Sequence, residues 1–313
     1  MKPILEAAVV IAAGAAISLA LVAGAGAQTS PLRERWRAKM EERMQQRAAE
    51  ESRPVDLAAI APGARKLTAS YGPAPLQAID VYVPPNARHA PVIVMVHGGA
   101  WKIGDKANHG LLENKLRHWL PMGYVFVSVD YRMLPEAMAL EQASDVAAAV
   151  RFVQAHAAGW GADPARLVLM GHSAGAHLVA LISADPSMVG RRWAGTVVLD
   201  SAAMDVPAVM GKRHARFYDE AFGADPAYWA RTSPIDRWTA AAEPMLLVCA
   251  LKRPDDSCGQ ARAFAAKAER AGRPTPVSPQ DLTHREVNEN LGLPGAYTDA
   301  VDRFIAQRLA ARG

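Results

Sequence analysis

The stretch Arg166-Leu167-Val168-Leu169-Met170-Gly171-His172-Ser173-Ala174-Gly175 decides the fold, because an apolar run leads directly into a serine held between two glycines. The apolar run predicts a buried parallel strand, and the helix-compatible segment 176–182 follows at once. Such a sharp strand–turn–helix junction strains the serine backbone and leaves no room for flanking side chains. The Ser173 hydroxyl is therefore predicted to stand exposed above the sheet as a nucleophile, near a helix N-terminus.

A second apolar run, residues 91–96, ends in His97-Gly98-Gly99-Ala100-Trp101. A turn of this kind can point backbone N–H groups at a developing oxyanion. We expect Gly98 and Gly99 to supply two of these donors and Ala174 the third. An ordinary Gly-Gly turn is the alternative. His97 precedes the candidate nucleophile, so it is expected to hold the turn by hydrogen bonding and not to act as a base.

A serine nucleophile needs a base and an acid that orients it, in the chain order serine, acid, histidine on this kind of fold. His284, in the polar loop 281–286, is the only histidine well downstream of the serine, so it is the candidate base. The acid should follow the predicted strand 244–250, and the next loop offers two adjacent aspartates. Asp256 is preferred because it stands closer to the following helix, and Asp255 remains an alternative.

Alternating strand and helix patterns predict one α/β domain with a mostly parallel central sheet and helices on both faces. The predicted strands are 79–83, 92–96, 125–129, 167–170, 196–199 and 245–250, with a weak one near 275–278. The predicted helices are 111–119, 140–157, 176–182, 260–270 and 297–308. The catalytic domain is expected to span 65–313.

An aromatic-rich stretch, residues 204–238, interrupts this alternation. It is interpreted as a small cap beside the acyl pocket, with plain surface packing as the equal alternative. Trp101 is expected to line the substrate pocket and to narrow one side of it. Small acyl groups should therefore be preferred weakly over long ones.

These segments resemble α/β-hydrolases of the esterase/lipase kind, and in particular the H-G-G-x-W group that includes carboxylesterases and kynurenine formamidases. The matching pieces are residues 97–101 with 104–106, the D-Y-R-x-x-P-E run 130–136, and the G-W-G-A-D-P run 159–164 before Ser173. The D-Y-R-x-x-P-E run is also similar to one in hormone-sensitive-lipase-like esterases, which usually carry H-G-G-G. This chain instead has Ala100 and Trp101 there, and the resemblance covers residues 65 to 310.

The resemblance implies a serine hydrolase that cleaves small-molecule carboxylic esters through an acyl-enzyme, with Ser173, Asp256 and His284 as its triad. An arylformamidase would use the same residues on an N-formyl bond and stays open. A non-catalytic exported protein of the same fold is the alternative from another class, although both the serine and the histidine are present. Oligomeric state cannot be read from the sequence.

No cofactor or metal is expected, because the chemistry needs none and neither C-x-x-C nor H-E-x-x-H occurs. The net charge of +4 and the pI of about 9.1 are modest. No basic stripe with interleaved aromatic residues appears, so nucleic acid is not an expected partner.

The N-terminus is expected to be a signal peptide, residues 1–27, with Lys2 before an apolar run and Ala25-Gly26-Ala27 as the cleavage site. This predicts export to a periplasm or the outside. A retained membrane anchor is the alternative. Residues 28–64 are expected to form a charged linker or helix, which could instead lie on anionic lipid.

Two cysteines, Cys249 and Cys258, flank the loop that carries the candidate acids. In an oxidising compartment they could close a disulfide across that loop. Cys249 could equally be a plain core residue of its strand, since the sequence does not show whether the two side chains meet.

Overall fold

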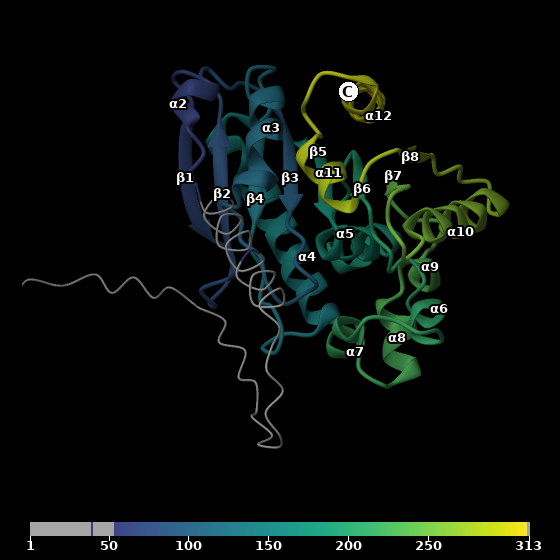
Figure 1. Cartoon of the computed structure of the whole chain (residues 1–313). Coiled ribbons are helices and arrows are strands. Elements are labelled where there is room, and N and C mark those ends of the chain that lie inside the picture. Colours follow the sequence, from purple (N-terminus) through teal and green to yellow (C-terminus); the bar gives the residue numbers. More distant parts are fainter. Residues whose placement is uncertain (1–38, 40–52, 312–313) are drawn as a thin grey trace, which may run out of the picture. The chain divides into compact units, whose positions relative to one another are not determined.

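The computed structural model of the 313-residue chain describes Lys39 and residues 53–311, which are coloured in Figure 1. The predicted signal peptide, 1–27, lies outside the described residues, as does most of the predicted charged segment 28–64. The chain divides into two compact units, Met1–Arg47 and Ala48–Gly313, and every element below belongs to the second. Within the described residues, no helix combines the length and apolar character needed to span a membrane.

One mostly parallel sheet forms the centre of the second unit, as the sequence predicts. Its strands are β1 (Arg65–Ser70), β2 (Ala78–Val83), β3 (Ala90–Val96), β4 (Val125–Val129), β5 (Ala162–His172), β6 (Gly195–Leu199), β7 (Met245–Ala250) and β8 (Val277–Gln280). Their order in the sheet is β1-β2-β4-β3-β5-β6-β7-β8. The pairs β1–β2 and β2–β4 are antiparallel, and every pair from β4 to β8 is parallel.

Strand β1 was not among the predicted strands, and the weak prediction near 275–278 is displaced to β8. The side chains of β1 are almost all exposed, because it lies at the edge of the sheet beside β2 only. Its sequence Arg-Lys-Leu-Thr-Ala-Ser therefore lacks the apolar alternation that marks a half-buried strand.

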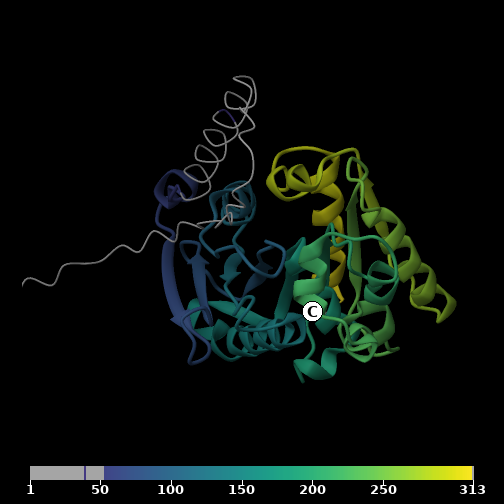
Figure 2. The ribbon, with the colours of Figure 1, turned by 60° about the horizontal axis from the view of Figure 1, so that its bottom comes forward.

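Helices cover both faces of the sheet (Figures 1 and 2). They are α2 (Leu57–Ile60), α3 (His109–Trp119), α4 (Ala139–His156), α5 (Ala174–Ala184), α10 (Ser257–Arg270), α11 (His284–Glu289) and α12 (Ala296–Ala310), with short 3-10 turns at Ala157–Trp160 and Pro186–Met188. Alternate residues of β3 belong to two different cores. Val92, Val94 and Val96 pack in the cluster with α4 and α5, whereas Ile93 and Met95 pack with α3 and α12.

The stretch predicted as a cap, 204–238, forms four short helices after β6. They are α6 (Val206–Met210), α7 (Arg216–Phe222), α8 (Pro226–Thr232) and α9 (Pro234–Arg237), which lie together at the lower right of Figure 1. Proline is the first residue of α8 and α9 and the second of α6, and an aspartate caps α6 and α8. Local sequence signals therefore begin each of α6, α8 and α9.

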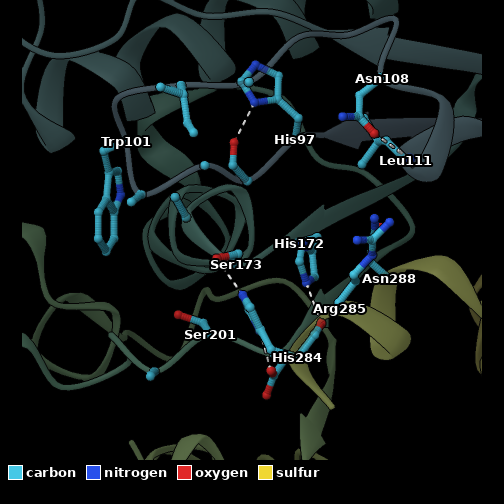
Figure 3. A pocket seen from close by; sticks show the side chains of 18 of the residues that line it. His97, Trp101, Asn108, Leu111, His172, Ser173, Ser201, His284, Arg285 and Asn288 are labelled. Atoms are coloured by element: carbon cyan, nitrogen blue, oxygen red, sulfur yellow. Dashed lines mark hydrogen bonds and ion pairs between the residues drawn. The ribbon is translucent and has the colours of Figure 1, made fainter. Parts of the chain in front are cut away.

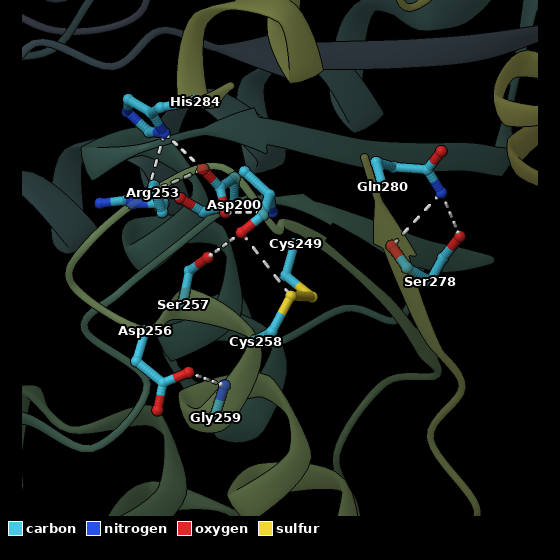
Figure 4. Close-up of a disulfide and its surroundings, with 11 residues drawn as sticks. Asp200, Cys249, Arg253, Asp256, Ser257, Cys258, Gly259, Ser278, Gln280 and His284 are labelled. Atoms are coloured by element: carbon cyan, nitrogen blue, oxygen red, sulfur yellow. Dashed lines mark hydrogen bonds and ion pairs between the residues drawn. A yellow bond between two sulfur atoms is a disulfide. The ribbon is translucent and has the colours of Figure 1, made fainter. Parts of the chain in front are cut away.

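A disulfide joins Cys249 at the end of β7 to Cys258 at the start of α10, and it ties together the two ends of the loop 250–257 (Figure 4). Both cysteines are buried. The possibility left open by the sequence is therefore realised, and the loop after β7 is cross-linked at its base.

Replacing both cysteines by alanine should lower the free energy of unfolding. The bridge closes a separation of nine residues, and loop-closure entropy for such a loop is worth roughly 2–3 kcal/mol. Urea unfolding of the double variant measures the loss. Wild-type protein reduced with dithiothreitol should show the same decrease, and equal stability of the oxidised wild type and the double variant would contradict the prediction.

A fully buried lysine joins α3 to α11. The Lys115 ammonium donates hydrogen bonds to the Asn288 backbone carbonyl at 2.6 Å and to its side-chain oxygen at 3.0 Å. Burial lowers the pKa of Lys115 to about 7, with Glu289 opposing the shift. The helix that begins at His284 is thus anchored by an amine that is only partly charged near neutral pH.

We expect Lys115 to make the protein more stable as the pH rises from about 7 toward 10. Its pKa is lower in the folded state than in the unfolded chain, so the unfolded state binds more protons in this window. The slope from this one group is up to about 1.4 kcal/mol per pH unit. Chemical unfolding at several pH values should show a flatter pH dependence for Lys115→Met.

The exposed Lys252 provides the matched control, because Lys252→Met removes the same charge without removing a buried amine. That variant should keep the wild-type slope. Parallel pH dependences for wild type and Lys115→Met would contradict the assignment.

Candidate active site

A pocket of about 530 Å³ opens at the ends of the parallel strands, and six of the predicted site residues line it (Figure 3). Ser173 follows β5 and His284 begins α11. The backbone of Gly98, Gly99 and Ala174 lines the same space, as does Trp101. The structure therefore brings these six predicted residues together around one pocket.

Ser173 occupies the strained turn that its sequence predicts. Its φ of 57° lies in the left-handed region, which costs a residue with a Cβ about 1–3 kcal/mol. Gly175, in the first turn of α5, packs directly on the end of β3. A Cβ there would lie 2.4 Å from the carbonyl oxygens of both Val96 and His97, so only glycine fits.

Three side chains form a continuous hydrogen-bonded row in the pocket. The Ser173 hydroxyl lies 2.9 Å from Nε2 of His284, and Nδ1 of His284 lies 2.5 Å from a carboxylate oxygen of Asp200. With Nδ1 protonated, the imidazole donates to Asp200 and its Nε2 accepts from the serine. This tautomer leaves Nε2 ready to take the serine proton.

Asp200 directly follows β6, and its side chain is fully buried. Burial alone would raise the pKa of Asp200. Hydrogen bonds from His284, Ser257 and the Ala250 N–H, with the positive charge of Arg253, outweigh burial and hold that pKa well below its usual range. The carboxylate is therefore ionised where it meets the imidazole.

The structure brings neither predicted acid to His284, and this corrects the sequence prediction. Asp256 is the N-cap of α10, and its Oδ1 accepts a hydrogen bond from the Gly259 N–H at 2.9 Å (Figure 4). Asp255 pairs through both oxygens with the guanidinium of Arg253. The loop after β7 thus uses its two carboxylates for capping and ion pairing.

Sequence reasoning missed Asp200 because it assigned the acid to the wrong strand end. A signal was present, since Asp200-Ser201 follows the buried run Thr196–Leu199 directly. In a parallel sheet, the end of β6 lies next to the end of β5, which carries Ser173. A polar residue at that position was an equally good candidate for the acid.

The His97-Gly98-Gly99 turn lies against the candidate nucleophile. A Cβ on Gly98 would approach the Ser173 Cβ to 2.8 Å, which shows how closely the two turns pack. Nδ1 of His97 donates to the Gly98 carbonyl at 2.7 Å, so this histidine holds the turn as expected. The Tyr131 hydroxyl donates to the His97 carbonyl at 3.0 Å, and the two rings stack at 4.5 Å.

A second histidine, the partly buried His172, packs against His284. The His172 ring stacks on the His284 ring at 4.5 Å, and its Nε2 donates to the His284 carbonyl at 3.0 Å. Burial, with the nearby His284 as a smaller cause, lowers the pKa of His172 to about 3. His172 is therefore neutral across the physiological range and contributes packing and one hydrogen bond.

Trp101 forms the apolar end of the pocket together with α7. Its ring lies within 6.3 Å of the rings of Phe217, Tyr218 and Phe222. The indole N–H donates to Nδ1 of the buried His177 at 3.2 Å. Figure 3 shows Trp101 on one side of Ser173, with Asn108, Arg285 and Asn288 on the other.

The described residues offer no group of three or more histidine, cysteine, aspartate or glutamate side chains that could hold a metal ion. The arrangement itself is that of a hydroxyl nucleophile with a base and a buried acid.

Comparison with known proteins agrees with this geometry. The BD-FAE family matches residues 79–204. A probable isoprenylcysteine alpha-carbonyl methylesterase of Arabidopsis thaliana is 39% identical over 111 residues, which cover 35% of this chain and 23% of the plant protein. Esterase LipQ of Mycobacterium tuberculosis is 30% identical over 224 residues, covering 66% of this chain and 53% of LipQ. The matches thus span about half or less of these relatives.

Solved structures share the fold over most of the chain. Esterase B from Lactobacillus rhamnosus superposes with a TM-score of 0.66 and 18% identity, covering 90% of this chain and 95% of that one. Esterase 2 of Thermogutta terrifontis gives a TM-score of 0.63 and 21% identity, covering 79% and 95%. The sheet order, the strained serine turn and these likenesses together show that the chain has the α/β-hydrolase fold, and its sequence relatives include esterases.

Proposed function

We propose that this protein is a serine hydrolase that cleaves carboxylic esters of small molecules through an acyl-enzyme. The observation that carries the proposal is the unbroken row of hydrogen bonds from Ser173 through His284 to the buried Asp200. Esterases among its sequence relatives support the same reaction class. A phosphonate-inhibited structure of the Lactobacillus esterase is among those sharing the fold.

In the first half of the reaction, Oγ of Ser173 attacks the ester carbonyl carbon while its proton passes to Nε2 of His284. Asp200 holds the imidazole in the required tautomer and stabilises the imidazolium that forms. The negative charge moves to the carbonyl oxygen. Backbone N–H groups of Gly98, Gly99 and Ala174 would bind this oxyanion, each contributing about 3 kcal/mol of transition-state stabilisation.

Collapse of this intermediate breaks the bond to the alcohol oxygen, which leaves with the proton from Nε2 of His284. The acyl group then remains on Ser173. Water attacks it by the same route, giving its proton to the imidazole, and the acid product and the free serine result. The alcohol part of the ester must lie beside His284 for this proton transfer, which leaves the opposite side of the serine for the acyl group.

The acyl side is closed by Trp101 and by α7, which brings Phe217 and Tyr218 into the pocket. We therefore include residues 204–238 in the proposal as a cap that limits the length of the acyl chain. Both aromatic side chains lie on the first turn of a seven-residue helix, and their rings lie 6.3 Å and 5.7 Å from the ring of Trp101.

We further propose that the enzyme works outside the cytoplasm. The predicted signal peptide 1–27 is the basis, and the Cys249–Cys258 disulfide supports it because such bridges persist in oxidising compartments. Association with a membrane through the N-terminal segment is the alternative outcome of a fractionation experiment on the full chain.

Turnover of p-nitrophenyl acetate and butyrate tests the reaction and the acid assignment together. Ser173→Ala, His284→Ala and Asp200→Asn should each lower kcat/KM by about 10³-fold or more, since the three residues act as a unit. Asp256→Asn is the matched control. It should keep wild-type activity and nearly all of the helix-cap stability, because asparagine caps helices about as well as aspartate.

A phosphonate ester provides a readout that does not depend on turnover. Mass spectrometry should find the adduct on Ser173 in the wild type and none in Ser173→Ala. The esterase proposal fails if the wild type neither turns over these esters nor is labelled. It fails in its choice of acid if Asp256→Asn loses activity and Asp200→Asn does not.

Short acyl esters should be preferred, because Trp101, Phe217 and Tyr218 shorten the acyl side. Hydrolysis of p-nitrophenyl acetate and laurate by wild type and Phe217→Ala measures this, and the variant should raise the laurate-to-acetate ratio of kcat/KM several-fold. Leu293→Ala, which shortens another exposed apolar side chain outside the pocket, should leave the ratio unchanged. A wild-type enzyme faster on laurate than on acetate would overturn the expectation.

A further inference from the structure

Arg253 lies in the loop after β7 and reaches the Asp200–His284 pair (Figure 4). Its side chain is only 12% exposed. The guanidinium Nη1 lies 2.8 Å from the Asp200 carboxylate oxygen Oδ2, 2.8 Å from the Asp200 backbone carbonyl and 2.8 Å from Nδ1 of His284. A permanent positive charge is thus in contact with both the acid and the base of the proposed site.

The same carboxylate oxygen receives both hydrogen bonds. His284 donates to Oδ2 of Asp200 at 2.5 Å, and Arg253 donates to it at 2.8 Å. Since Nδ1 of His284 carries the proton given to Asp200, it cannot accept a hydrogen bond from Arg253. Nη1 of Arg253 and Nδ1 of His284 are therefore two donors that lie close together and share one acceptor, Oδ2 of Asp200.

This arrangement opposes protonation of the imidazole in two ways. A cation 2.8 Å from Nδ1 disfavours a second positive charge on the ring. The guanidinium also takes up part of the Asp200 charge that would otherwise stabilise an imidazolium. Both effects have the same sign, so they add.

The fold holds Arg253 in this place. Asp255 binds its guanidinium through both carboxylate oxygens from the outer side. The Cys249–Cys258 disulfide closes the base of the loop that carries both residues. The sequence predicts the acid in the loop after β7. In the structure this loop instead brings the Arg253 guanidinium to Asp200, which follows the neighbouring strand β6.

We propose that Arg253 is a positioning residue that shares Asp200 with His284 and weakens the hold of Asp200 on a protonated imidazole, so that replacing Arg253 makes His284 easier to protonate. The role in catalysis rests on the esterase function proposed above. The enzyme is then expected to keep its activity at lower pH than a Ser–His–Asp site without such a cation.

The other charged or titratable groups around His284 do not oppose protonation of its imidazole in the way that Arg253 does. Ser173 faces Nε2, and His172, stacked on the ring from β5, is kept neutral by burial. Lys115 of α3 acts on His172 from a distance, and Tyr297 interacts with the charge of Asp200. Tyr218 interacts chiefly with Asp255, whose carboxylate is paired with Arg253, and more weakly with Arg253 and Asp200. Arg285 is directed to Glu289.

Two pH measurements on Arg253→Gln test the proposal. The acid limb of the kcat/KM profile should move to higher pH by about one unit or more. The NMR titration of the His284 imidazole, identified by its absence in His284→Gln, should move in the same direction. Arg253→Lys, which retains the charge, should stay closer to the wild-type midpoint than Arg253→Gln in both measurements.

Lys252→Gln removes a positive charge from the same loop, where the side chain pairs with Asp281 and is half exposed, and should leave both midpoints unchanged. A purely structural role for Arg253 would lower activity at all pH values without moving the midpoints, and that result overturns the proposal. The NMR titration needs no turnover, so it decides on Arg253 even if the protein proves inactive on esters.

Discussion

The contact between the start of α5 and the end of β3 is the constraint on which the site depends. Gly175 lies so close to the carbonyl oxygens of Val96 and His97 that a methyl group there would meet both at 2.4 Å. This approach fixes the serine turn against the turn that follows β3. This packing holds Ser173, with its left-handed backbone, beside the candidate oxyanion donors, as a site preorganised for a developing charge requires.

Residues that follow β4, the strand beside β3, support the turn after β3 from the other side. Asp130, directly after β4, accepts hydrogen bonds from the Lys106 backbone N–H at 2.6 Å and from its ammonium at 2.9 Å. The next residue, Tyr131, holds the His97 carbonyl. Arg132 then donates to Asp145 of α4 through both ends of its guanidinium. The D-Y-R run thus connects the pocket turn to a core helix, although none of its three side chains lines the pocket.

The sequence was sufficient wherever a local pattern determines geometry. Continuous apolar runs predict the buried parallel strands, and glycines around Ser173 and after His97 predict the two turns. It was insufficient for β1, whose exposed edge needs no apolar pattern, and for the acid. Asp256 and Asp200 each follow a buried strand, and only the packing of β6 beside β5 together with the path of the loop after β7 distinguishes them.

The acid on β6 changes what the loop after β7 can do. If the loop after β7 supplied the acid, Arg253 and the other aspartate of that loop would have no part in the site. With Asp200 in place, the loop closes over a fully buried carboxylate that needs more than one donor to remain ionised. Arg253, Ser257 and the Ala250 N–H supply these donors, and all three lie within the segment that the disulfide spans or borders. The cross-link, the ion pair with Asp255 and the charge state of the acid are therefore parts of one local structure.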